Sequence, residues 1–94
     1  MKPISNFMAK LARDFSDQPV VVEVILRGQW KNLMGERINT HSLPIGFQDG
    51  VLQVGTSDER WMEELSRLSE DIRKRINTFL GKEVVRTIRF TQKS

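Results

Sequence analysis

The chain has 94 residues, no cysteine and a formal net charge of +3, which fits one small domain and excludes a disulfide framework or thiolate metal site. No stretch has the apolar length of a membrane span or the apolar run of a signal peptide, which favours a cytoplasmic protein. Residues 1–65 carry seven Lys/Arg against nine Asp/Glu, whereas residues 66–94 carry eight against three. This basic C-terminal third suits polyanion binding, or else a solubilising surface.

Two helices are predicted at the start of the chain. Residues 3–15 carry an apolar face at helical spacing, made of Ile4, Phe7, Met8, Leu11 and Phe15. Residues 16–19 (SDQP) break this pattern. Residues 20–26 (VVVEVIL) have the β-branched composition of a strand, but the apolar positions between Val22 and Met34 also fit a helical stripe. We favour a helix that runs to about Ile38.

A hairpin and a last strand are predicted further on. Apolar residues alternate over residues 43–55 on both sides of Asp49-Gly50, the dipeptide that a type I′ turn prefers. Residues 83–90 read as a strand with Val84, Ile88 and Phe90 on one face, although Arg86 interrupts that face.

The clearest signal is one long helix over residues 56–81. Thr56 and Glu59 have the spacing of a capping box, and Gly81 can stop the helix. Its apolar stripe, together with one tryptophan of the second helix, gives the predicted structural core: Trp30, Trp61, Leu65, Leu68, Ile72 and Ile76.

The resulting order, α-α-β-β-α-β, predicts an α+β fold. Three strands form one sheet with the helices packed on one face, and residues 1–94 make a single domain. The order of the strands in the sheet stays open.

Basic residues of the C-terminal third are the candidate nucleic-acid contacts: Arg73, Lys74, Arg75, Lys82, Arg86, Arg89 and Lys93. Some cations have an acid four residues earlier that would partly neutralise them, in the pairs Glu63–Arg67, Glu70–Lys74 and Asp71–Arg75. No such local partner is predicted for Arg73, Lys82, Arg86, Arg89 or Lys93.

Three further side chains have a functional and a structural interpretation. Trp30 and Trp61 could be stacking platforms for bases or partner anchors, but both lie on apolar stripes, which favours core packing. His41 is the only histidine, so it makes no metal-ligand cluster, and a place at a helix end explains it. We therefore expect no metal, no cofactor, no small-molecule substrate and no catalytic site, because no cluster of polar groups could line one.

A set of short motifs carries a family resemblance. They are residues 30–38 (WKNLMGERI), 41–44 (HSLP), 49–54 (DGVLQV), 75–77 (RIN) and 88–90 (IRF), with Ser57, Trp61, Leu65 and Gly81 between them. No single motif is specific, but their order and spacing together resemble the DciA family over about two-thirds of the chain.

This resemblance implies a KH-like domain and a bacterial DNA-replication accessory protein that engages the DnaB-type replicative helicase. It also implies weak binding of single-stranded or duplex DNA, a nucleoid-associated place in the cytoplasm, and no contact with membranes. The sequence ends four residues after Phe90, without the C-terminal extension that many members carry. KH domains clamp a strand with a Gly-x-x-Gly loop between two helices, and the link at residues 16–19 has no glycine. The alternative is a protein-interaction module that binds no nucleic acid.

Overall fold

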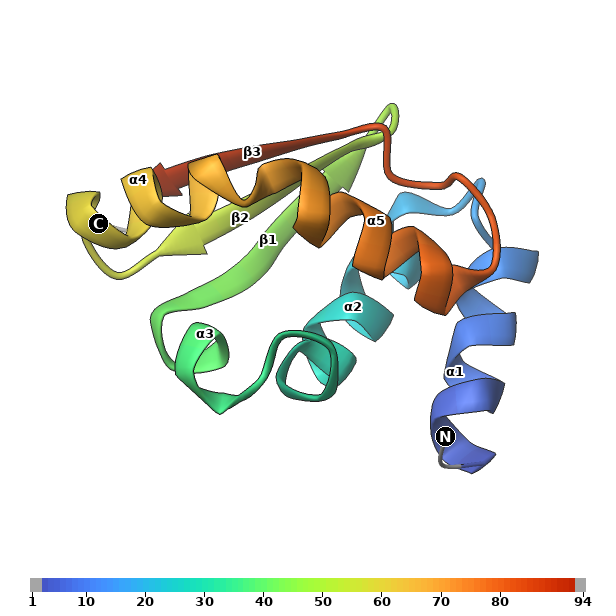
Figure 1. The fold of residues 1–94 in the computed structure, drawn as a ribbon. Helices are drawn as coiled ribbons and strands as arrows, with labels where there is room; N and C mark the ends of the chain where they lie inside the picture. Colours follow the sequence, from blue (N-terminus) through green and yellow to red (C-terminus); the bar gives the residue numbers. More distant parts are fainter. Residues whose placement is uncertain (1–2, 93–94) are drawn as a thin grey trace.

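The computed structural model describes residues 3–92, in which three helices precede a pair of strands, and two further helices precede a last strand (Figure 1). Their order is α1 (Pro3–Asp14), α2 (Pro19–Met34), α3 (Glu36–His41), β1 (Ser42–Gln48), β2 (Val51–Thr56), α4 (Glu59–Arg67), α5 (Ser69–Leu80) and β3 (Thr87–Gln92). The predicted α+β class is confirmed, and the predicted element order holds once two of the expected helices are each divided in two.

The three strands form one mixed sheet in the order β1-β2-β3. Strands β1 and β2 are antiparallel, whereas β2 and β3 are parallel, so the chain must cross over through α4 and α5. Leu52 lies opposite Phe47 on one side and Ile88 on the other, and all three are buried. Gln53 and Arg89, one position further along their strands, are exposed. The alternation gives the sheet one core face, against which the helices pack (Figure 1).

The predicted hairpin is confirmed. Asp49 has φ 53° and Gly50 has φ 80°, and two positive φ values in the central positions are what a type I′ turn requires. An irregularity in the pairing between Pro44 and Gly46 bends β1.

Residues 19–34 are a helix, so the strand interpretation of residues 20–26 is wrong. The helix ends at Met34 and not at Ile38, because Gly35 adopts φ 87°, a backbone conformation open to glycine. A short separate helix, α3, then leads into β1. The buried face of α2 includes Trp30, whose indole N–H donates to the Ser42 hydroxyl at 3.0 Å.

The prediction of a single helix over residues 56–81 is also wrong, because the helix is interrupted at Leu68, between α4 and α5. Leu68 has φ −96° and ψ 7°, and its side chain is 40% exposed, so its place in the predicted core is a second error. The apolar period continues across the break, which is why periodicity alone did not reveal it.

The helix start was misplaced as well. Thr56 is the last residue of β2, and its hydroxyl donates to the Thr91 carbonyl at 2.9 Å across the parallel pair. Asp58 is the N-cap instead, and its carboxylate accepts the Trp61 backbone N–H at 2.8 Å.

Strand β3 begins at Thr87, four residues later than predicted. The preceding residues 83–86 have no regular structure and are held by the side chain of Asn77, which is 8% exposed. Its Oδ1 accepts the backbone N–H groups of Val84 and Val85 at 3.1 and 2.9 Å, and its Nδ2 donates to the Val85 carbonyl at 2.8 Å. Arg86 therefore precedes the strand, so it no longer interrupts an apolar strand face.

Helix α1 packs through small residues. Ser5, Ala9 and Ala12 are buried, whereas Ile4 and Phe7 are 63% and 59% exposed. The apolar face predicted for this helix thus points largely to solvent, because a close approach to α2 and α5 requires the face with the smallest side chains.

Replacing Asn77 by alanine should destabilise the fold by about 3 kcal/mol, because two buried N–H groups and a carbonyl lose their partners. Urea unfolding followed by circular dichroism measures the change. The matched control is Asn32→Ala, which removes an exposed amide and should cost less than about 0.5 kcal/mol. Equal losses for the two variants would contradict the anchoring role.

Candidate functional site

The candidate basic residues do not gather on one surface. Arg73, Lys74 and Lys82 surround a shallow depression of about 500 Å³ at the C-terminal end of α5. Arg75 lies on another side of the helix, where it donates to the Leu33 carbonyl at 3.3 Å. The remaining candidates lie at β3, and Lys93 is outside the described residues.

Arg73 is fully engaged, contrary to the prediction that it has no local partner. Its guanidinium pairs with Glu70 at 2.8 Å and with Glu83 at 2.5 Å, and its side chain is only 18% exposed. The hydrogen bonds that Arg73 donates to Glu70, and then to Glu83, raise the pKa of Arg73 above its usual range. This ion pair clasps α5 to the segment that Asn77 anchors, so its first role is structural.

The predicted helical ion pairs also differ from those formed. Among the described residues, Arg67 pairs with Glu64 and not Glu63, and Glu70 pairs with Arg73 and not Lys74. In both observed pairs the two residues are three positions apart. On a helix this spacing brings side chains together about as well as a spacing of four positions. Lys74 is therefore exposed, and residues 3–92 contain no ion pair to it.

Arg86 and Arg89 are exposed cations at the sheet. Arg86 donates to the Asp49 carbonyl at 2.8 Å, which holds it over the hairpin turn, and Arg89 lies on the sheet face away from the core. Neither forms an ion pair with any residue in the described range, and the same holds for Lys82. These three cations can therefore accept an anionic partner without breaking an internal ion pair.

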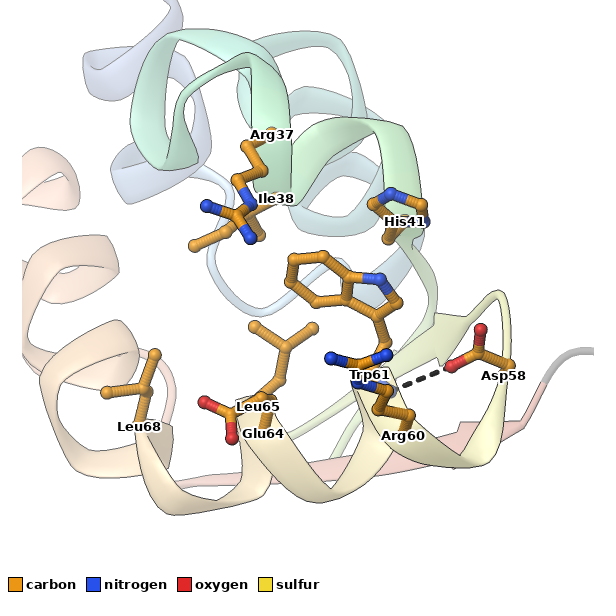
Figure 2. Close-up of a pocket in the computed structure, with 9 residues that line it drawn as sticks. All are labelled: Arg37, Ile38, His41, Asp58, Arg60, Trp61, Glu64, Leu65 and Leu68. Atoms are coloured by element: carbon orange, nitrogen blue, oxygen red, sulfur yellow. Dashed lines mark hydrogen bonds between the residues drawn. The ribbon is translucent and has the colours of Figure 1, made fainter.

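A second feature is a hollow of about 640 Å³ between α3 and α4, shown in Figure 2. Trp61 lies at its centre, stacked on His41 with ring centroids 4.4 Å apart and planes 12° apart. The Arg37 guanidinium lies 5.8 Å from the indole centroid. Trp61 is only partly buried against the core, so its prediction as a core residue is correct in part, whereas Trp30 is fully buried.

Sequence reasoning did not select the hollow. Arg37 and Arg60 were not among the predicted nucleic-acid contacts, and His41 was assigned to a helix end. His41 and Trp61 lie on different helices, so their contact could not be predicted from the spacing of apolar residues in the sequence. Leu65, Ile72 and Ile76 lie in the core as expected.

No Gly-x-x-Gly occurs anywhere in the sequence. The structure adds two helix–helix links, at Gly35 between α2 and α3 and at Leu68 between α4 and α5, and neither contains a pair of glycines. A KH-type clamp on a nucleic-acid backbone is therefore absent, and any contact must use other groups.

Within residues 3–92 no three acidic, histidine or cysteine side chains converge as metal ligands. The described helices include none with the length and apolarity to traverse a bilayer.

These features define a small α+β protein with separate basic and aromatic surfaces. The chain matches the family model described as "Dna[CI] antecedent, DciA" over residues 3–90, so it belongs to the DciA family. The match starts well before Trp30, where the resemblance in the motifs began.

Several actinobacterial proteins are similar to the chain. It is 29% identical over 90 residues to a UPF0232 protein of Rhodococcus jostii and 28% identical to one of Mycobacterium tuberculosis. Each comparison covers 96% of this chain and 48% of the relative. The chain therefore spans about half the length of these curated relatives.

The Arg73 clasp predicts a pH dependence. A hydrogen bond from Arg73 lowers the pKa of Glu70 below its usual 4.5, so the stabilisation is present above that pH and is lost as the pH falls through the folded-state pKa. Glu70→Gln should thus lower the urea midpoint at about pH 6, and its difference from wild type should shrink as the pH falls below 4.5. The control is Glu63→Gln, an exposed carboxylate with no ion pair in the described range. A Glu70→Gln difference that does not vary with pH would contradict the clasp.

Proposed function

We propose that this protein is a bacterial DNA-replication accessory protein that engages the DnaB-type replicative helicase and binds DNA weakly. The observation that carries the proposal is the family match over residues 3–90. A protein with this role acts in the cytoplasm, at the nucleoid.

Lys74, Lys82, Arg86 and Arg89 are the cations best suited to DNA, because they are exposed and no ion pair to them exists in the described part of the chain. Phosphate contacts of this kind are independent of sequence and sensitive to salt. Arg73 is a weaker candidate, since two carboxylates hold it, and Arg75 lies on another side of α5, where it donates to the Leu33 carbonyl. We expect these exposed cations to bind DNA by attracting its phosphates to the protein surface, without a loop that clamps the strand.

For the helicase, the exposed apolar face of α1 is the surface that we favour. Ile4, Phe7 and Phe15 are 63%, 59% and 46% exposed at helical spacing, and Val20 and Val24 extend the apolar surface onto α2. Large apolar side chains in such a row are costly in water and typical of protein contacts.

Changing Lys82, Arg86 and Arg89 together to glutamine should weaken DNA binding about tenfold at low salt and reduce the slope of log K against log salt by up to about 3. Fluorescence anisotropy with labelled DNA measures both. The control changes Lys10, Arg27 and Lys31, three cations with internal ion pairs, to glutamine and removes the same charge. If the control variant weakens DNA binding equally, binding depends only on net charge, and the assignment of Lys82, Arg86 and Arg89 as DNA contacts is wrong.

Replacing Ile4 and Phe7 by serine should abolish the complex with the helicase in size-exclusion chromatography with light scattering, while the urea midpoint changes little. Ile45→Ser, which changes a 43% exposed residue on the sheet, is the control and should leave the complex intact. No complex with the wild-type chain would refute helicase engagement. A complex without any DNA binding would favour the alternative, a protein-interaction module alone.

A further inference from the structure

The hollow between α3 and α4 has the composition of a binding site and no structural role that accounts for all of it. Its walls come from α3, from the loop that carries Asp58, and from α4 to the break at Leu68 (Figure 2). It lies at the end of β2 where α4 begins. Arg86 lies at the opposite end of β2, where its backbone N–H donates to the Gly50 carbonyl. The hollow is thus separate from the basic surface proposed above.

The aromatic part of the hollow is held rigid. The His41 imidazole stacks on Trp61, and its Nδ1 lies 3.0 Å from the Ser57 hydroxyl. The Asp58 carboxylate holds the backbone of Trp61 in place, because it accepts the Trp61 N–H in the N-cap hydrogen bond. Trp61 nonetheless remains partly exposed, so part of the indole is accessible from the hollow.

The free charge at the rim is positive. Arg37 and Arg60 are exposed, and the described residues form no ion pair with either of them. The two rim carboxylates are already engaged, Asp58 in the helix cap and Glu64 in its pair with Arg67 at 2.5 Å. An anion that enters the hollow therefore meets two available guanidinium groups.

The floor is apolar. Ile38 and Leu65 line it, and the break between α4 and α5 leaves Leu68 40% exposed beside them. A flat apolar group next to an anion matches this surface, and a nucleotide has both parts.

We propose that the hollow binds one unstacked nucleobase of single-stranded DNA, packed against Trp61, with the adjacent phosphates held by Arg37 and Arg60. The inference rests on the proposed DNA binding and gives it a strand preference. In a duplex the bases are stacked and paired, so only a single strand can place one against the indole. An acidic peptide would meet the same two arginines but offer no aromatic plane. The exposed part of the indole therefore favours a nucleotide over an acidic peptide.

Tryptophan fluorescence tests the proposal. A twelve-nucleotide oligothymidylate should quench the emission of the wild-type chain in a saturable manner, whereas an abasic oligonucleotide of the same length, with phosphates but no bases, should not. Trp61→Phe should remove the quenching, because the remaining Trp30 is fully buried and bonded to Ser42. Changing Arg37 and Arg60 to glutamine should raise the dissociation constant from quenching about tenfold. Lys10→Gln with Lys31→Gln removes the same charge elsewhere and should leave it within about twofold.

Each other outcome overturns the inference. Equal quenching by the abasic strand would mean an anion site without base recognition. Binding seen by anisotropy without quenching would leave the basic surface intact and refute the hollow. Absence of any DNA binding would refute both. Quenching by the helicase but not by the oligothymidylate would assign the hollow to a protein contact.

Discussion

The fold depends on how the chain returns to the sheet after α5, and one buried amide controls that return. Strand β3 must lie parallel to β2, so the chain has to leave α5 at Gly81 and cross to the far end of the sheet. Asn77 replaces the missing backbone partners of the irregular residues 83–86, and Arg73 adds an ionic link to Glu83 from the same helix. Without these contacts, buried N–H groups would face the core unpaired.

This constraint explains why the basic residues divide as they do. Arg73 is drawn into the clasp and leaves the set of available cations, while Arg86 is placed over the hairpin turn at the start of β3. The antiparallel pairing of β1 with β2 places Ser42 opposite Thr56, which brings the start of α4 beside the end of α3, and Trp61 meets His41 there. The crossover to β3 therefore places the cations, and the hairpin places the hollow.

Because the sequence has no Gly-x-x-Gly loop, the DNA binding that we propose must use contacts different from those of a clamping KH domain. We propose a division of surfaces: cations near β3 for phosphates, the hollow around Trp61 for an unstacked base, and the apolar face of α1 for the helicase.

The sequence by itself determined the α+β class, the hairpin at Asp49-Gly50 and the buried stripe with Leu65, Ile72 and Ile76, because these depend on local period and turn chemistry. It could not locate the break at Leu68, since the apolar spacing runs through it, nor the burial of Ala9 and Ala12 in place of Ile4 and Phe7. Only the tertiary structure decided those features, the parallel pairing of β3 and the meeting of His41 with Trp61. Each depends on contacts between residues distant in the chain, and local propensity carries no information about them.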